Sequence, residues 1–212
     1  MRKPKISPKL AEFVGIMLGD GSIVANGRIK QYVVYVCGNS IDDERYLLEF
    51  IKPLIKNLFD VEMSVKYHQK FKEILLYKYS KDFVKILEGI GLKAGNKKDN
   101  NVCFPNWVFA DKKLIAACLR GLFNTDGTIY KRWKHRGYFI EFSSSIPKLQ
   151  NDITRALDYL RINHSKWFIS GGSIKRGGRC SICSQGEVKR FLSTVGSSNP
   201  KYSETIQKAR VV

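Results

Sequence analysis

The sequence is poor in acidic residues and lacks any long apolar run. Only 19 of its 212 residues are Asp or Glu, against 37 Lys or Arg, which gives a formal net charge of +18. A compact domain with this charge repels itself unless a polyanion neutralises it, so nucleic acid is the expected partner, with an anionic membrane surface as the alternative. No apolar stretch reaches the roughly 20 residues that span a bilayer, so we expect no membrane segment.

Cysteine and histidine are also scarce. The five cysteines are an odd number, and no apolar signal segment follows the basic N-terminus, so a disulfide framework and secretion are not expected. Cys180 and Cys183 have CxxC spacing, but a structural zinc site needs two more ligands at matching spacing, and the three histidines are scattered. We therefore expect no metal or redox role for the cysteines, and a cytoplasmic protein associated with the nucleoid.

The chain contains an internal repeat. Residues 10–23 (LAEFVGIMLGDGSI) are matched by residues 116–129 (AACLRGLFNTDGTI) at an offset of 106 residues, which pairs Asp20 with Asp126. The match continues downstream with small slips. Two copies of about a hundred residues predict a pseudo-two-fold molecule, the single-chain form of a symmetric dimer.

Hydrophobic periodicity and turn residues predict the same order of elements in both copies. In the first half we expect helices over 8–19, from a Ser40 cap to Leu58 with a kink or early end at Pro53, and over 81–90, with strands over 29–37, 61–68 and 72–79. In the second half we expect helices over 112–125, 146–161 and 186–195, strands over 128–133, 137–143, 165–170 and 178–183, and a basic tail over 199–212. The expected fold class is α+β, with two αββαββα halves at residues 1–91 and 112–212 and a linker at 92–111.

Small residues occupy one face of the first helix of each half. Gly15 and Gly19 are four residues apart and therefore share a helical face, and Gly121 and Thr125 supply the same face in the second half. Glycine lets a second helix approach backbone to backbone. We expect the two helices to pack side by side along the pseudo-two-fold axis.

An aspartate ends each of these helices. Asp20 and Asp126 are each followed by glycine, which is typical of a helix end, so two carboxylates and two negative helix termini converge. Divalent cations would relieve the repulsion, and hard oxygen ligands with open positions suit Mg²⁺. The alternative interpretation is that both aspartates only end helices in Asp-Gly turns.

The two motifs resemble the signature of the LAGLIDADG homing endonuclease family. They read FVGIMLGDG at residues 13–21 and LRGLFNTDG at residues 119–127. Residues 91–97 and 104–107 also resemble the stretch before the second motif in archaeal intron- and intein-borne members, and residues 196–201 resemble its counterpart, so the resemblance covers nearly the whole chain. It implies a monomeric, archaeal, intron-encoded hydrolase whose β-sheets form a saddle on double-stranded DNA and which cuts both strands.

The resemblance also implies the residues of the active site. Asp20 and Asp126, with Gly19 and Thr125 before them, would bind two or three Mg²⁺ ions, for which Mn²⁺ substitutes, at the two scissile phosphates. Lys97 and Lys201 occupy equivalent places in the two halves and are expected to stabilise phosphate charge or polarise water, with Lys98 as a rival for Lys97. The expected catalytic residues are therefore Asp20, Asp126, Lys97 and Lys201.

Some relatives carry Gln or Lys at the end of the second strand. This chain has Gly38-Asn39 and Ser143-Ser144 at those places. The residue that positions water is therefore left open.

Basic and polar residues on the strands and hairpins are expected to contact DNA. Arg, Lys and Gln can read base edges in the major groove, while other lysines bind phosphates. The candidates are Ser22, Arg28, Lys30, Gln31, Lys66, His68, Lys70, Lys72, Tyr130, Arg132, Lys134, His135, Arg136, Lys166, Lys175, Arg176 and Arg179. The hairpin tips at 25–28 and 171–178 differ, so the DNA site is expected to be asymmetric.

Two other functions remain open. One is a LAGLIDADG-fold DNA-binding protein or RNA maturase without cleavage, and the other is a basic RNA-associated structural protein. The presence of both aspartates favours cleavage, and matched glycine-helix and aspartate pairs have no role in a structural protein. No protein-splicing block is visible, so a stand-alone intron-encoded enzyme is expected rather than an excised intein domain, and no small-molecule substrate is expected.

Overall fold

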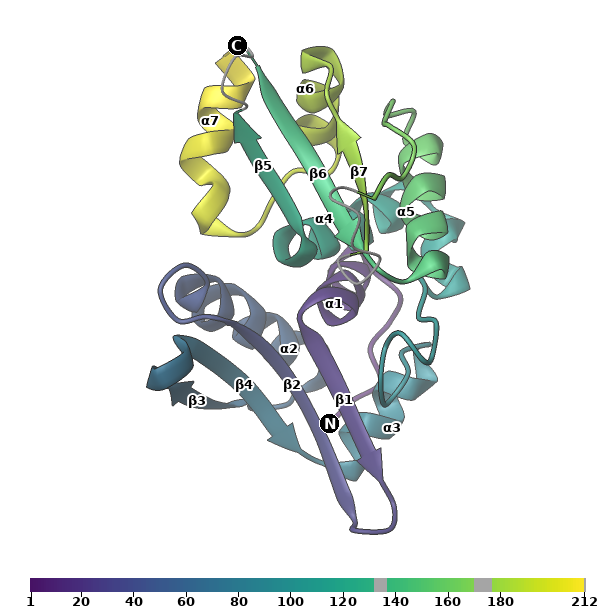
Figure 1. The fold of residues 1–212 in the computed structure, drawn as a ribbon. Helices are drawn as coiled ribbons and strands as arrows, with labels where there is room; N and C mark the ends of the chain where they lie inside the picture. The colour runs from purple at the N-terminus through teal and green to yellow at the C-terminus, as the bar shows by residue number, and fades with distance from the viewer. Residues whose placement is uncertain (132–136, 170–176, 212) are drawn as a thin grey trace.

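The two halves of the chain lie on either side of a central pair of helices. The structure is a computed structural model that describes residues 1–131, 137–169 and 177–211. Helix α1 (Pro8–Gly19) begins the first half and helix α4 (Lys112–Asp126) begins the second. In Figure 1 the first sheet lies below this pair and the second sheet above it. The expected α+β fold of two halves packed through their first helices is confirmed.

The first half contains a four-stranded antiparallel sheet. Strands β1 (Gly21–Asn26), β2 (Gln31–Asn39), β4 (Glu73–Tyr79) and β3 (Ser64–His68) pair in that spatial order. Ile23 and Val34 pair with each other and are buried, so this face of the sheet packs on the helices. Because side chains alternate along a strand, Ser22 and Tyr35 in the next pair lie on the opposite, open face.

The helical segment between β2 and β3 begins and bends differently from expectation. The Oδ1 atom of Asn39 accepts hydrogen bonds from the N–H groups of Ile41 (2.8 Å) and Asp42 (3.3 Å), so Asn39 caps this segment and the expected Ser40 cap is wrong. A π-helix, η1 (Tyr46–Ile51), leads into α2 (Lys52–Phe59), which has Pro53 in its first turn. Proline has no N–H for the preceding turn, and the wider π turn accommodates the missing bond. Two further elements complete this half, the short helix η2 (Gln69–Phe71) and α3 (Lys81–Gly89).

The second half repeats this order with one strand fewer in its described part. Strands β5 (Gly127–Lys131), β6 (Tyr138–Ser144) and β7 (Gly178–Ile182) form the sheet, in that order. Its helices are α5 (Pro147–Tyr159), α6 (Gln185–Thr194), η5 (Pro200–Tyr202) and α7 (Ser203–Val211).

The expected strand over 165–170 is wrong within the described residues. A single bridge joins Phe168 to Arg179, and the N–H of Ser181 donates to the Oγ atom of Ser165 rather than to a backbone carbonyl. Ser165 is paired with Ser181 and Phe168 with Arg179. The first segment therefore has one residue more than the second between the two pairs, which is the geometry of a bulge. The extra residue prevents a continuous ladder.

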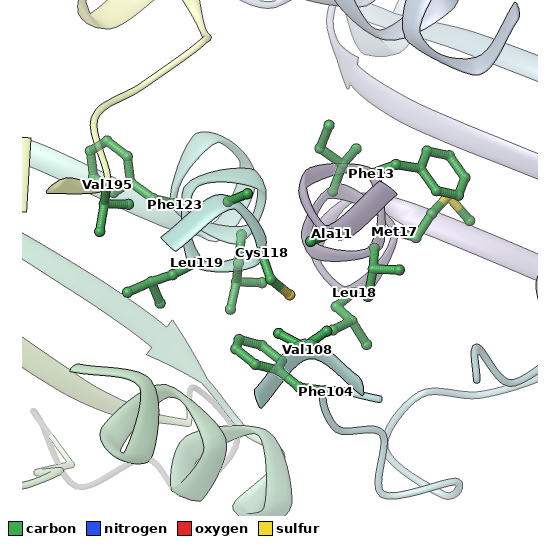
Figure 2. Close-up of a cluster of buried hydrophobic side chains, with 14 of the residues drawn as sticks. Ala11, Phe13, Met17, Leu18, Phe104, Val108, Cys118, Leu119, Phe123 and Val195 are labelled. Carbon is green, nitrogen blue, oxygen red and sulfur yellow. The ribbon is translucent and has the colours of Figure 1, made fainter. Parts of the chain in front are cut away.

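Large side chains radiate from the central helix pair. Figure 2 shows α1 and α4 side by side, with Phe13 directed away from α4 and Phe123 directed away from α1. Phe104 and Val108 of the segment between the halves lie beneath both helices, and Val108 belongs to the short helix η3 (Asn106–Ala110). This segment therefore contributes to the core. None of the helices in the described ranges has the length and apolar character needed to cross a bilayer.

Candidate active site

The two central helices touch through their backbones. A Cβ atom on Gly15 would lie 2.0 Å from the carbonyl oxygen of Cys118, and one on Gly121 would lie 2.1 Å from that of Glu12. The same offset of 106 residues relates both glycines and both carbonyls, so the two contacts are pseudo-symmetric. No residue with a side chain fits either position without separating the helices.

The carboxyl ends of the helices meet at the same place. A Cβ atom on Gly19 would lie 1.9 Å from the Oγ1 atom of Thr125 and 3.5 Å from the Cγ atom of Asp126. The Thr125 hydroxyl donates back to the carbonyls of Gly121 (3.3 Å) and Leu122 (3.0 Å) within its own helix. Glycine and threonine thus bring the second aspartate against the end of α1.

The two aspartates lie in an environment that disfavours their charge. Burial raises the pKa of Asp20 to about 7, and the negative charges of Asp126 and Asp43 act in the same direction. Burial also raises the pKa of Asp126. The Asp126 side chain does reach solvent, but it sits in a concave part of the surface where surrounding protein displaces much of its hydration. A bound cation would stabilise both carboxylates.

The available donors fit a divalent metal of the magnesium type. Within the described ranges there is no group of three or more His, Cys, Asp or Glu side chains placed to hold a metal. The ligands expected from the sequence remain a prediction: the two carboxylates and the backbone oxygens of Gly19 and Thr125. Mg²⁺ commonly binds one or two carboxylates, keeps several waters and takes further ligands from substrate phosphates, so this small set of hard oxygen donors suits it.

Lys97 lies at the end of α1. Its Nζ atom donates to the carbonyl oxygen of Leu18 at 3.0 Å and also to that of Gly19. Burial lowers the pKa of Lys97, while the charges of Asp126 and Asp20 oppose this shift. Lys98, the rival candidate, is exposed. The Gly19 oxygen, expected as a metal ligand, is therefore already an acceptor for an ammonium group.

Lys201 has a different partner. Its Nζ atom donates to the Oδ1 atom of Asp43 at 2.8 Å, and the Nδ2 atom of Asn199 donates to the same oxygen at 3.2 Å. Burial lowers the pKa of Lys201, but the hydrogen bonds to Asp43 and Tyr202 outweigh this and leave it raised. Asp43 and Asn199 are not among the site residues predicted from the sequence.

A pocket adjoins Asp126. Its lining includes Gly19, Lys97, Asp126 and residues 143–145, the serine run that ends β6. At the end of β2 in the first half, a Cβ atom on Gly38 would lie 2.9 Å from the Cβ atom of Asp43, so this strand end packs tightly against Asp43. The two strand ends that lack the family's Gln or Lys are therefore unlike each other.

The first sheet presents several of the expected DNA-contacting residues on its open face. By strand register these are Ser22, Gln31, Lys66 and His68. His68 is engaged with Glu73, with 2.9 Å between Nδ1 and Oε2. The remaining candidates of this half lie in the two hairpin turns: Arg28, Lys30, Lys70 and Lys72.

The second sheet places Tyr130 and Arg179 on its open face around a buried carboxylate. The Tyr130 hydroxyl donates to Glu141 at 3.4 Å, and Nη1 of Arg179 lies 3.3 Å from the other oxygen of Glu141. Lys166 is exposed beside β7. The other candidates lie outside the described residues: Arg132, Lys134, His135, Arg136, Lys175 and Arg176.

Two family models match the chain, one in each half. The LAGLIDADG-like domain matches residues 113–196, and the WhiA LAGLIDADG-like domain matches residues 10–103. Among curated proteins, the chain is 28% identical to the ribonucleoside-diphosphate reductase NrdEB subunit alpha of Bacillus subtilis, over 71% of this chain and 14% of that protein. It is 25% identical to the DNA-directed RNA polymerase subunit Rpo1N of Methanocaldococcus jannaschii, over 94% of this chain and 16% of that protein. The chain thus spans about one-seventh of the length of these relatives.

Solved structures share the fold. The homing endonuclease I-DmoI in complex with DNA and Mn has a TM-score of 0.66 and 18% identity, over 92% of this chain and 99% of that chain. Full-length DUF199/WhiA from Thermatoga maritima has a TM-score of 0.59 and 16% identity, over 98% of this chain and 62% of that chain. With one LAGLIDADG-like unit matched in each half and this shared two-unit fold, the chain belongs to the LAGLIDADG family.

Proposed function

We propose that the chain is a homing endonuclease that cuts both strands of a long, asymmetric DNA site by divalent-metal-dependent hydrolysis. One observation carries the proposal: two helices packed backbone to backbone bring Asp20 and Asp126 together between two sheets with open faces. The fold shared with I-DmoI, solved with DNA and Mn, supports DNA as the partner and a divalent ion as the cofactor. We propose Mg²⁺ as the working ion, a monomeric enzyme, and nucleoid DNA as its place of action.

The chain's own residues account for orientation and charge at the cut. The net charge of +18 draws the phosphate backbone onto the sheets, and the two hairpin regions fix the register of the duplex. Divalent ions bound at the aspartates would polarise the phosphate and lower the pKa of water. In each cut a water oxygen bonds to phosphorus, the bond to the 3′ oxygen breaks, and that oxygen leaves with a proton. Lys97 and Lys201 stabilise the negative charge that develops on the phosphate.

The test is cleavage of a plasmid library that carries candidate intron-insertion junctions. We would compare the wild type with Asp20→Asn and Asp126→Asn in Mg²⁺ and in Ca²⁺. The matched control is Asp99→Asn, which neutralises an exposed aspartate of the segment between the halves. We expect discrete double-strand cuts in Mg²⁺ by the wild type and the control, and no double-strand cuts by the other two variants, which retain DNA binding in Ca²⁺.

A second function is kept open by the family match of the first half. Residues 10–103 match the WhiA LAGLIDADG-like domain, which is compatible with a LAGLIDADG-fold protein that binds DNA, or RNA as a maturase, without cutting. Tight, salt-sensitive binding with no cleavage in any metal would establish this function. Asp20 and Asp126 would then serve only as helix ends.

A further inference from the structure

The two central lysines have matched positions in the sequence but different partners in the structure. Lys97 donates to the last carbonyls of α1, those of Leu18 and Gly19. The equivalent carbonyl of Leu18 in α4 is that of Asn124, and it accepts a hydrogen bond at 3.2 Å from the amide of Asn199 instead. The Lys201 ammonium turns to Asp43 in the other half of the molecule. The pseudo-two-fold symmetry of the helices therefore does not extend to their lysines.

The reason lies in a single acidic residue. Alignment of residues 39–41 with residues 144–146 places Lys148 opposite Asp43, so the second half carries a cation where the first half carries a carboxylate. Asp43 is held in place by its neighbours, since its Oδ2 atom accepts the Asn39 N–H at 3.1 Å and its Oδ1 atom accepts the Asn199 amide. This fixed carboxylate attracts Lys201 across the interface between the halves.

The two centres therefore differ in charge. Lys97 shares a pocket with Asp126, and among the described residues no carboxylate forms an ion pair with it. The charged group that acts on Asp126 is the ammonium of Lys97. Asp20, by contrast, feels two further carboxylates, Asp126 and Asp43, and two ammonium groups, Lys97 and Lys201, and Asp43 forms an ion pair with Lys201. A phosphate entering the Asp20 centre meets one more negative charge.

We propose that Asp43 is a positioning residue that binds the Lys201 ammonium and makes the Asp20 centre the slower of the two, so that the strand at Asp126 is cut first. This inference rests on the proposed endonuclease function. The chemistry is the same hydrolysis at both centres. The strands differ because the Lys97 ammonium is held by the neutral carbonyl oxygens of Leu18 and Gly19, whereas the Lys201 ammonium is held by a carboxylate.

The test resolves the two strands of one duplex. A target duplex with a different fluorophore at each 5′ end is cut under single-turnover conditions in saturating Mg²⁺. We expect the wild type to cut one strand about fivefold faster or more, with a nicked intermediate, a difference well within the effect of one charge on a barrier. Asp43→Asn keeps a side-chain oxygen for Asn199 and should accelerate the slow strand alone. Lys97→Met should slow the fast strand alone.

Controls separate this role from a structural one. A loss of folding slows both strands together, so a change confined to one strand cannot come from instability. Asp42→Asn, at the exposed neighbouring aspartate, should leave both rates unchanged. Lys201→Met should slow the slow strand further, since it leaves Asp43 without its cation. Melting temperature and DNA binding in Ca²⁺ complete the comparison.

Three outcomes overturn the inference. Equal rates for both strands in the wild type remove its premise. A slower strand that slows further in Asp43→Asn would show that the carboxylate assists the reaction. Absence of cutting by the wild type in any metal rejects the proposed function, and this inference with it.

Discussion

At the scale of single residues, the ionised form of Asp20 lowers the stability of the metal-free fold. Its pKa is raised to about 7 from an ordinary value of 3.8, first by burial and then by Asp126. At a pH between these two pKa values, Asp20 is protonated in the folded chain but ionised in the unfolded chain. The contribution of Asp20 to the free energy of unfolding therefore falls as pH rises. The contribution is fully present below pH ~4 and is lost above pH ~7 in the absence of a divalent ion.

This sign leads to a prediction for the metal-free protein. In EDTA, the melting temperature of Asp20→Asn should exceed that of the wild type by an amount that grows from pH 4 to pH 7. Addition of Mg²⁺ at pH 8 should then raise the melting temperature of the wild type more than that of the variant. Differential scanning fluorimetry measures both effects, with Asp99→Asn as the exposed control. Parallel pH curves for the wild type and Asp20→Asn would contradict the burial of this carboxylate.

At the scale of elements, the contact between α1 and α4 depends on two glycines. An added methyl group at Gly15 would meet the Cys118 carbonyl at 2.0 Å, and backbone atoms cannot move aside as a flexible side chain can. We expect Gly15→Ala to lower the free energy of unfolding by about 3 kcal/mol, the upper end of ordinary overpacking. Urea denaturation checks this value, and Gly121→Ala should behave in the same way.

Gly89 provides the matched control. It ends α3, and a Cβ atom there would meet nothing within 4 Å. Gly89→Ala should therefore raise the free energy of unfolding by about 0.5–1 kcal/mol, because alanine favours the helix. If Gly15→Ala also raised the free energy of unfolding slightly, as Gly89→Ala should, the two helices would not be in backbone contact.

These elements also show what the sequence can predict. The central helices, their glycine face and the aspartates at their ends follow from a short repeated pattern, which depends only on local spacing. The strand over 165–170 was predicted wrongly because the Ser165 hydroxyl replaces a backbone carbonyl, a substitution that periodicity does not reveal. The pair of Asp43 and Lys201 joins residues 158 positions apart, so no local pattern could have indicated it.

The open face of the first sheet is more apolar than binding to DNA phosphates requires. Strand register places the partly exposed side chains of Val24, Tyr35, Leu75 and Tyr77 on it, whereas the corresponding face of the second sheet carries several polar groups. Thymine presents a methyl group in the major groove, and apolar side chains read it by contact. We infer that this sheet reads thymine methyl groups in its half of the target.

Uracil substitution tests this reading. Replacing thymine by uracil removes only the methyl group, so each contacted position in the half-site under the first sheet should cost about 0.8 kcal/mol, or roughly fourfold in affinity. Substitution in the other half-site is the control and should cost less. Competition binding in Ca²⁺ measures both. Equal losses in the two half-sites would contradict the assignment.

At the scale of the whole molecule, the contribution of each basic residue to DNA binding depends on where it lies on the surface. Lys66 is on the open face of the first sheet, whereas Lys85 is exposed on α3, which packs against this sheet through buried residues such as Phe83 and Val84. Both lysines add the same charge to the chain. Only a lysine that contacts a phosphate releases a counterion on binding.

The slope of log affinity against log salt therefore distinguishes the two positions. Lys66→Ala should reduce the magnitude of this slope by about 0.9, the contribution of one phosphate contact, and should weaken binding to different sequences alike. Lys85→Ala removes the same charge and should leave the slope unchanged. Fluorescence anisotropy over a range of KCl concentrations in Ca²⁺ gives both slopes. If the two variants lose the same amount, the net charge of the chain attracts DNA without a preferred face, and the saddle formed by the two sheets is not the binding surface.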